Sequence, residues 1–196
     1  MKAAVITASR KVEVVSTSLP EPAADEIRVR LEGCGVCASS LPVWEGREWF
    51  RYPLDAGAPG HEGWGVVDAI GDGVDNVREG ERVAFLSGRA FAEYDLTKRD
   101  SFVRIPGELA GRKFPGEAIG CAMNIFRRSE IERGQTVVVI GAGFLGNLLI
   151  QLAKSGGARV IAVSRRESAR ELAKTCGADE TIPMNDHGEI IGRIRE

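Results

Sequence analysis

The sequence contains no apolar run that approaches the ~20 residues of a membrane-spanning helix. Its start, MKAAVITASRKVEVV, has one lysine before an apolar run that is too short for the core of a signal peptide. Charge of one sign is not in excess either, because 26 basic residues are mixed with 28 acidic ones. We therefore expect a cytoplasmic protein with no membrane segment and no basic surface for nucleic acid.

Histidine and cysteine are scarce, with two and four residues in the chain. In a reducing compartment, cysteines are more often buried, catalytic or metal-bound than paired in disulfides. Cys34 and Cys37 lie in GCGVCASS, and His61 and Glu62 follow in GAPGHEGWGVV. One interpretation of the second stretch is a polar loop before a strand. The other is a zinc site with nitrogen, sulfur and oxygen ligands and one open position.

The first half of the chain has the pattern of short strands separated by turns. Residues 26–32 alternate apolar and charged side chains, which is typical of a half-buried strand. Another strand is expected over 64–70, followed by the turn cluster GDGVDN. Short strands at this spacing predict an all-β domain, either a compact barrel or a sandwich, over residues 1–115.

The pattern changes at residue 116 and predicts a second, α/β domain over 116–196. Strands and helices now alternate, as they do around a parallel sheet. The expected elements are a helix over 116–131, a continuous buried strand over 137–140, a helix that the glycine loop opens and that runs to about Ser155, a second strand over 159–163 and a helix over 167–175.

A glycine pattern, G-x-G-x-x-G, joins the first strand of this second half to its helix. In that context the first glycine permits a tight turn, and the second lets backbone approach a pyrophosphate at the positive end of the helix. The alternative is that the glycines only let the helix pack on the sheet. The loop predicts dinucleotide contacts from Gly141, Gly143, Phe144, Leu145 and Gly146.

The end of the next strand bears on which dinucleotide binds. An NAD site usually offers an acidic residue there for the ribose hydroxyls. This chain has Ser164, Arg165 and Arg166, with no carboxylate before Glu167. Two guanidinium groups and a hydroxyl suit a 2′-phosphate, so NADP(H) is favoured over NAD(H). Two alternatives stay open: the arginines form a solvated start of the helix, or Glu167 reaches the ribose.

Four motifs in this order resemble the zinc-dependent medium-chain dehydrogenases, the group of alcohol, sorbitol and threonine dehydrogenases. They are GCGVC, GHEGWGVV, IGDGVDNVREGERVAF and VVVIGAGFLG. The resemblance covers essentially the whole chain. It implies an N-terminal GroES-like β-barrel catalytic domain followed by a partial Rossmann domain, a doubly wound parallel sheet. Family members are longer, so we expect a C-terminally truncated chain whose own activity is in doubt.

The resemblance also implies a ligand set for one catalytic zinc. Cys37 and His61 match zinc ligands of such enzymes, and Glu62 matches the adjacent carboxylate that binds zinc or exchanges with its water. Two residues compete for the remaining ligand position. Counting back from the glycine loop favours Glu117, and Cys121, one helical turn further on, is the alternative.

Other positions follow or depart from the family pattern. Ser39 matches the hydroxyl that relays the substrate proton, whereas Ser40 replaces the usual aspartate. The cysteine-rich lobe that holds a second, structural zinc is absent. Cys34 and Cys176 are therefore interpreted as buried small residues.

The implied activity is hydride transfer between a secondary alcohol or polyol, or the matching carbonyl compound, and NAD(P). Trp49 and Phe50 are candidates for the wall of the substrate pocket, and a homo-oligomer is a possible assembly. One alternative is a zinc-free NADPH quinone or enoyl reductase of the same superfamily. The other is an inactive binding remnant.

Overall fold

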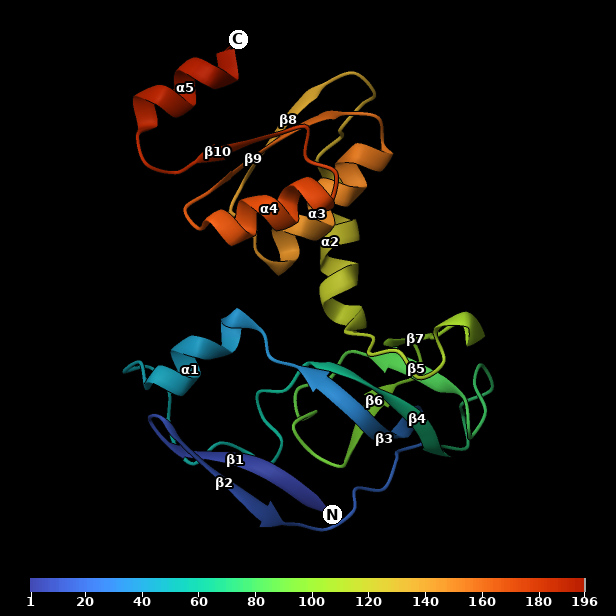
Figure 1. Cartoon of the computed structure of the whole chain (residues 1–196). Helices are drawn as coiled ribbons and strands as arrows, with labels where there is room; N and C mark the ends of the chain where they lie inside the picture. The colour runs from blue at the N-terminus through green and yellow to red at the C-terminus, as the bar shows by residue number, and fades with distance from the viewer. Residues whose placement is uncertain (196) are drawn as a thin grey trace. The chain divides into compact units, whose positions relative to one another are not determined.

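The computed structural model describes residues 1–195, and the chain divides into two compact units, Met1–Glu117 and Ala118–Glu196. The division falls two residues after the expected boundary at 115, in the first turn of helix α2 (Gly116–Arg128). Figure 1 shows strands in the first unit, and a sheet flanked by helices in the second. In the part that the model describes, no helix is both long enough and apolar enough to cross a membrane.

The first unit contains two antiparallel sheets. A hairpin forms one of them, and the other has five strands in the order β6-β3-β4-β5-β7. A 3₁₀ turn over Ala38–Ser40 and helix α1 (Leu41–Glu45) follow the third strand. The strands are β1 (Lys2–Ala8), β2 (Lys11–Ser16), β3 (Glu26–Gly35), β4 (Glu62–Ile70), β5 (Arg82–Phe85), β6 (Tyr94–Lys98) and β7 (Phe102–Arg104).

Alternation along β3 explains how this unit forms its core. Ile27 and Val29 are fully buried, whereas the charged side chains between and beyond them lie nearer the surface. Ile27 and Val29 pack with Val67, Val83 and Phe85 of the neighbouring strands. The expected barrel is not closed among the described strands: the hairpin shares no strand ladder with the five-stranded sheet, and it joins the rest of the unit through an isolated bridge between Ala3 and Ala92 and through loop hydrogen bonds.

The second unit is built on a parallel sheet in the order β10-β9-β8. Alternate residues of the central strand point to opposite faces, so each face has its own core. Val160 and Ala162 pack in the cluster that includes residues of α3 and α4, and Ile161 packs with Ile190 of α5. The elements are β8 (Thr136–Ile140), α3 (Phe144–Ser155), β9 (Arg159–Ser164), α4 (Glu167–Thr175), β10 (Glu180–Pro183) and α5 (His187–Arg195).

The expectation of a fully buried strand over 137–140 is wrong. Val137 to Val139 are only half-buried, and Ile140 is 68% exposed. The reason is the strand order, which puts β8 at an edge of the described sheet and leaves β9 in the centre. By contrast, the helix expected over 167–175 begins and ends at those residues.

This difference between the two strands gives a testable prediction about stability. Ile161→Ala removes a fully buried side chain from the central strand, and we expect a loss of about 2–5 kcal/mol in the free energy of unfolding. Ile140→Ala makes the same change at an exposed position and should stay within about 0.5 kcal/mol of the parent. Urea unfolding measures both, and equal losses would contradict the strand order.

Candidate metal centre and nucleotide cavity

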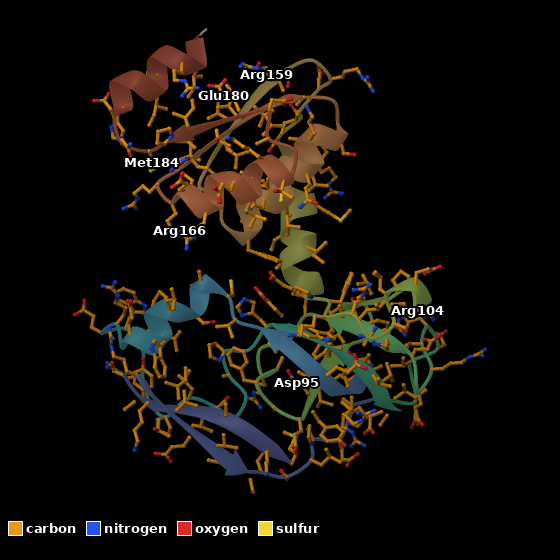
Figure 2. All side chains as sticks on the ribbon, viewed as in Figure 1. Asp95, Arg104, Arg159, Arg166, Glu180 and Met184 are labelled. Atoms are coloured by element: carbon orange, nitrogen blue, oxygen red, sulfur yellow. The ribbon has the colours of Figure 1, made fainter. Side chains whose placement is uncertain are left out.

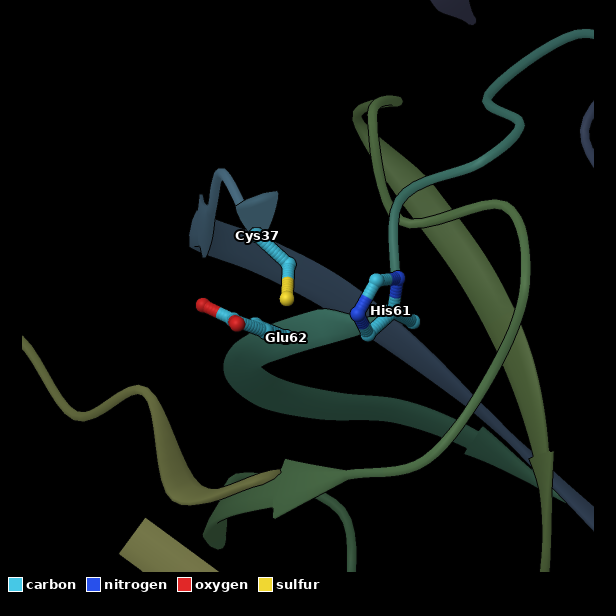
Figure 3. A group of neighbouring side chains, drawn as sticks. All are labelled: Cys37, His61 and Glu62. Atoms are coloured by element: carbon cyan, nitrogen blue, oxygen red, sulfur yellow. The ribbon is translucent and has the colours of Figure 1, made fainter. Parts of the chain in front are cut away.

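Three of the four predicted metal ligands converge in the first unit. The Cys37 sulfur, a ring nitrogen of His61 and a carboxylate oxygen of Glu62 all lie within 4.8 Å of one another. Figure 3 shows the Cys37 sulfur between the His61 ring and the Glu62 carboxylate. This set combines a sulfur, a nitrogen and an oxygen donor, which are the ligand types that Zn²⁺ takes in proteins. The donor set therefore fits zinc.

The pairing of β3 with β4 brings these side chains together. In this register Gly33 lies opposite Trp64, and Gly35 lies opposite Glu62. A Cβ atom at Gly33 would be 2.3 Å from the Trp64 ring, and one at Gly35 would be 1.9 Å from Glu62 Oε2. The glycines of GCGVC thus make room for the two large side chains of GHEGWG, and Glu62 is held buried beside the end of β3.

The loop before His61 is fixed on both sides. The amide of Gly57 donates to the carbonyl of Ala4 at 2.8 Å, and the carbonyl of Gly57 accepts from the amide of Phe91 at 3.0 Å. A Cβ atom at Gly57, where φ is +87°, would lie 2.0 Å from a backbone oxygen, and one at Gly60 would lie 2.4 Å from a backbone nitrogen. The glycines around the histidine are therefore required by close backbone contacts.

The orientation of the His61 ring is set by its own loop. Its Nδ1 lies 2.9 Å from the carbonyl oxygen of Pro59. A carbonyl only accepts, so Nδ1 carries the proton and Nε2 keeps the lone pair that a metal requires.

Charge around the ring also favours a cation. Burial lowers the pKa of His61, but the hydrogen bond to Pro59 and the nearby Cys37 and Glu117 raise it by more, so that the pKa is raised overall. Cys34 is different, because burial raises the pKa of its thiol to about 11. We conclude that Cys34 stays a neutral thiol at physiological pH. Its side chain is only half-buried, whereas the sequence predicts a buried residue.

The other residues that the sequence connects with this centre are not among the three that converge. Glu117 is half-buried in the first turn of α2 and acts electrostatically on His61, although it is not among the three residues that converge. Cys121 is exposed on the same helix. Ser39 is exposed in the 3₁₀ turn, whereas the Oγ of its neighbour Ser40 is buried and has no hydrogen-bond partner in the described part of the chain.

The glycine loop of the second unit has the backbone features that the sequence predicts for it. Gly141 has a φ of +100°, which favours glycine. A Cβ atom at Gly146 would lie 2.0 Å from the Gly141 oxygen, whereas one at Gly143 would meet nothing within 4 Å. Gly143 is the N-cap of α3, so its backbone is open to a ligand at the positive end of a helix. Phe144 and Leu145 are exposed in the first helical turn.

A cavity of about 510 Å³ lies where this loop meets the end of β9. It is lined by residues of the glycine loop and by Ser164, Arg165 and Arg166, which the sequence singles out, and by two apolar residues, which it does not. These two are Ile140 and Met184, at the ends of the neighbouring strands. Figure 2 shows Arg166 and Met184 at the same end of the unit. No local pattern marks Met184, because only strand pairing brings it to this cavity.

The two sites define a class of protein: a chain with a candidate metal centre in a β unit and a dinucleotide-type glycine loop in an α/β unit. Residues 23–127 match the family model of the alcohol dehydrogenase GroES-like domain, and residues 145–196 match that of the zinc-binding dehydrogenase. The chain therefore belongs to the zinc-binding dehydrogenase family, and the expected pairing of a GroES-like domain with a Rossmann-type sheet is confirmed.

Curated relatives include alcohol and polyol dehydrogenases. An alcohol dehydrogenase of Geobacillus stearothermophilus is 31% identical over 95% of this chain and 65% of its own length. The galactitol 1-phosphate 5-dehydrogenase of Escherichia coli K12 is 30% identical over 95% of this chain and 62% of its own length. The chain thus spans about two thirds of the length of these relatives.

Solved structures of similar fold contain both kinds of nicotinamide cofactor. The short chain alcohol dehydrogenase (rspB) of Escherichia coli CFT073, solved with NADH, has a TM-score of 0.88 and 27% identity, covering 100% of this chain and 66% of that chain. A protein of Sinorhizobium meliloti 1021 described as a zinc-binding dehydrogenase was solved with NADP. It has a TM-score of 0.81 and 27% identity, and the match covers 93% of this chain and 61% of that chain.

The close approach of Gly35 to Glu62 gives a prediction for metal binding. A methyl group in Gly35→Ala would overlap the Glu62 carboxylate, so we expect zinc affinity to fall about 10- to 100-fold while the chain stays folded. Gly88→Ala is the matched control, because a Cβ atom there meets nothing within 4 Å. Titration with zinc against a competing chelator measures both variants. Unchanged affinity in a folded Gly35→Ala chain would contradict the role of this contact.

Proposed function

We propose that this chain is part of a zinc-dependent oxidoreductase that transfers a hydride between a secondary alcohol or polyol, or the matching carbonyl compound, and NADP(H). The observation that carries the proposal is the convergence of Cys37, His61 and Glu62 in a chain that also has the open glycine loop of a dinucleotide site. The alcohol and polyol dehydrogenases among its relatives support the same chemistry.

We assign one catalytic zinc to this centre, held by Cys37, His61, Glu62 and Glu117. The charge of Glu117 acts on His61, and its position in the first turn of α2 supports its choice over Cys121. We propose no structural zinc, because the sequence lacks the cysteine-rich lobe that holds it.

Each residue has a proposed task in the reaction. Bound zinc supplies Lewis acidity, which lowers the pKa of an alcohol so that it ionises near neutral pH. Ser39, exposed in the 3₁₀ turn after Cys37, carries the released proton outward. Trp49, which is 66% exposed and stacks at a tilt on Phe50 with ring centroids 6.0 Å apart, offers an apolar wall for the carbon chain of the substrate.

The preference for NADP(H) is proposed from the end of β9. Ser164, Arg165 and Arg166 line the cavity, and both arginines are exposed to a ligand there. Guanidinium groups bind phosphate through charge-assisted hydrogen bonds, whereas a ribose hydroxyl is better held by a carboxylate. Glu167 does not line this cavity, which supports a 2′-phosphate over a free hydroxyl.

The alternative of a zinc-free quinone or enoyl reductase finds less support. A quinone oxidoreductase of Pseudomonas syringae has a similar fold, with a TM-score of 0.84, but at 22% identity this likeness concerns the fold alone. A reductase without zinc has no use for a thiol, an imidazole and a buried carboxylate around one point.

Metal analysis of the purified chain tests the proposal directly. We expect about one zinc per chain, weakened in Glu117→Gln because a charged oxygen ligand is lost. Cys121→Ser is the matched control on the same helix and should keep the metal. A folded chain that binds no zinc would overturn the zinc mechanism. If Cys121→Ser loses zinc and Glu117→Gln keeps it, the fourth ligand is Cys121 instead of Glu117.

Turnover separates an enzyme from a binding remnant. NADPH formation with a panel of secondary alcohols and polyols is expected only in zinc-loaded protein and should be lost in His61→Ala. Equal rates in the metal-free chain would contradict the proposal. Turnover with NAD but not NADP would leave the zinc mechanism intact and refute the cofactor preference.

A further inference from the structure

The turn between β9 and α4 is held by a side chain from inside the helix. Nη1 of Arg170 donates to the carbonyl oxygens of Ser164, at 2.9 Å, and of Arg165, at 2.8 Å. No side-chain hydrogen bond caps α4 at its N-cap residue, Arg166. Arg170 therefore links the helix to the turn by donating to carbonyls, whereas a capping side chain would accept from the amides of the first helical turn.

These hydrogen bonds fix the backbone of two of the three residues on which the proposed cofactor preference depends. The carbonyl of Ser164 also accepts from the amide of Met184 at 3.3 Å, so the turn is tied to the next strand as well. Ser164, Arg165 and Met184 all line the cavity beside the glycine loop. The backbone that carries the two cavity residues is thus bound from both sides.

The same contacts change the electrostatics of the strand end. An unpaired carbonyl there would present partial negative charge, which repels a phosphate and attracts a hydroxyl. Arg170 satisfies two of these oxygens with a cationic donor and adds a positive charge close to Arg165 and Arg166. Because Arg170 is half-buried, solvent screens this charge less than that of a fully exposed arginine.

We propose that Arg170 is the positioning residue for cofactor choice: by binding the carbonyls of Ser164 and Arg165, it holds the end of β9 in the form that selects a 2′-phosphate. The inference rests on the proposed preference for NADP(H) and extends it to a residue outside the cavity lining. It concerns one cofactor group, the phosphate on the adenosine ribose.

Two small probes isolate this group, because 2′,5′-ADP differs from 5′-AMP only by the 2′-phosphate. Calorimetric titration of the full chain gives the ratio of the two affinities. In Arg170→Gln we expect this ratio to fall about tenfold, since a charge-assisted clamp is lost. Lys174→Gln is the control: it removes one positive charge from the same helix and should leave the ratio unchanged.

The ratio distinguishes positioning from a merely structural role. If Arg170→Gln weakens both probes equally, or neither, the inference is overturned. Arg165→Gln tests the cofactor proposal separately. If Arg165→Gln loses the preference for 2′,5′-ADP and Arg170→Gln keeps it, only the role of Arg170 is refuted. A parent chain that binds both probes with equal affinity refutes the NADP preference itself.

A second variant covers the case in which Arg170→Gln does not fold. Lysine in Arg170→Lys keeps the charge but ends about one bond short of Nη1, so both carbonyl contacts weaken. Here we expect the ratio to fall at least about threefold. A folded Arg170→Lys chain with the ratio of the parent would overturn the inference, because charge alone would then be sufficient.

Discussion

The candidate metal centre depends on the antiparallel pairing of β3 with β4. This register places Gly35 against Glu62 and Gly33 against Trp64, at distances that exclude any larger residue without a shift. A slip by one residue would turn each side chain to the other face of the sheet. The cluster therefore results from the pleat of one strand pair and from two glycines that make room in it.

Rigidity of the loop before His61 complements this pairing. Backbone hydrogen bonds hold the loop to β1 and to the segment before β6, and the Pro59 carbonyl sets the protonated ring nitrogen. Ligands whose rotamers are fixed in advance bind a metal without further loss of conformational entropy. The same logic applies in the second unit, where Gly141 and Gly146 fix the turn by contact and Gly143 leaves it open.

Periodicity and motifs were sufficient to predict much of this molecule. Alternation of apolar and charged residues predicted β3, and apolar residues at helical spacing predicted α3 and α4. These patterns are local because an element that buries one face has apolar residues at a regular spacing. The exposure of β8 and the open sheet arrangement of the first unit were not predictable in this way. They depend on strand order, which joins distant segments through backbone groups that every residue has. The clamp from Arg170 was missed for the same reason, because its acceptors are carbonyls.

Charge balance explains why the three converging side chains suit a cation. A thiol, a buried carboxylate and the nearby Glu117 lie around a single imidazole. Anionic groups at such separations repel each other strongly when solvent is partly excluded, and each is costly to bury alone. Burial lowers the pKa of His61, but the hydrogen bond to Pro59 and the nearby Cys37 and Glu117 together outweigh it, so that the pKa is raised. A divalent cation would relieve the repulsion and satisfy these groups at once, which is why the arrangement suits a bound metal.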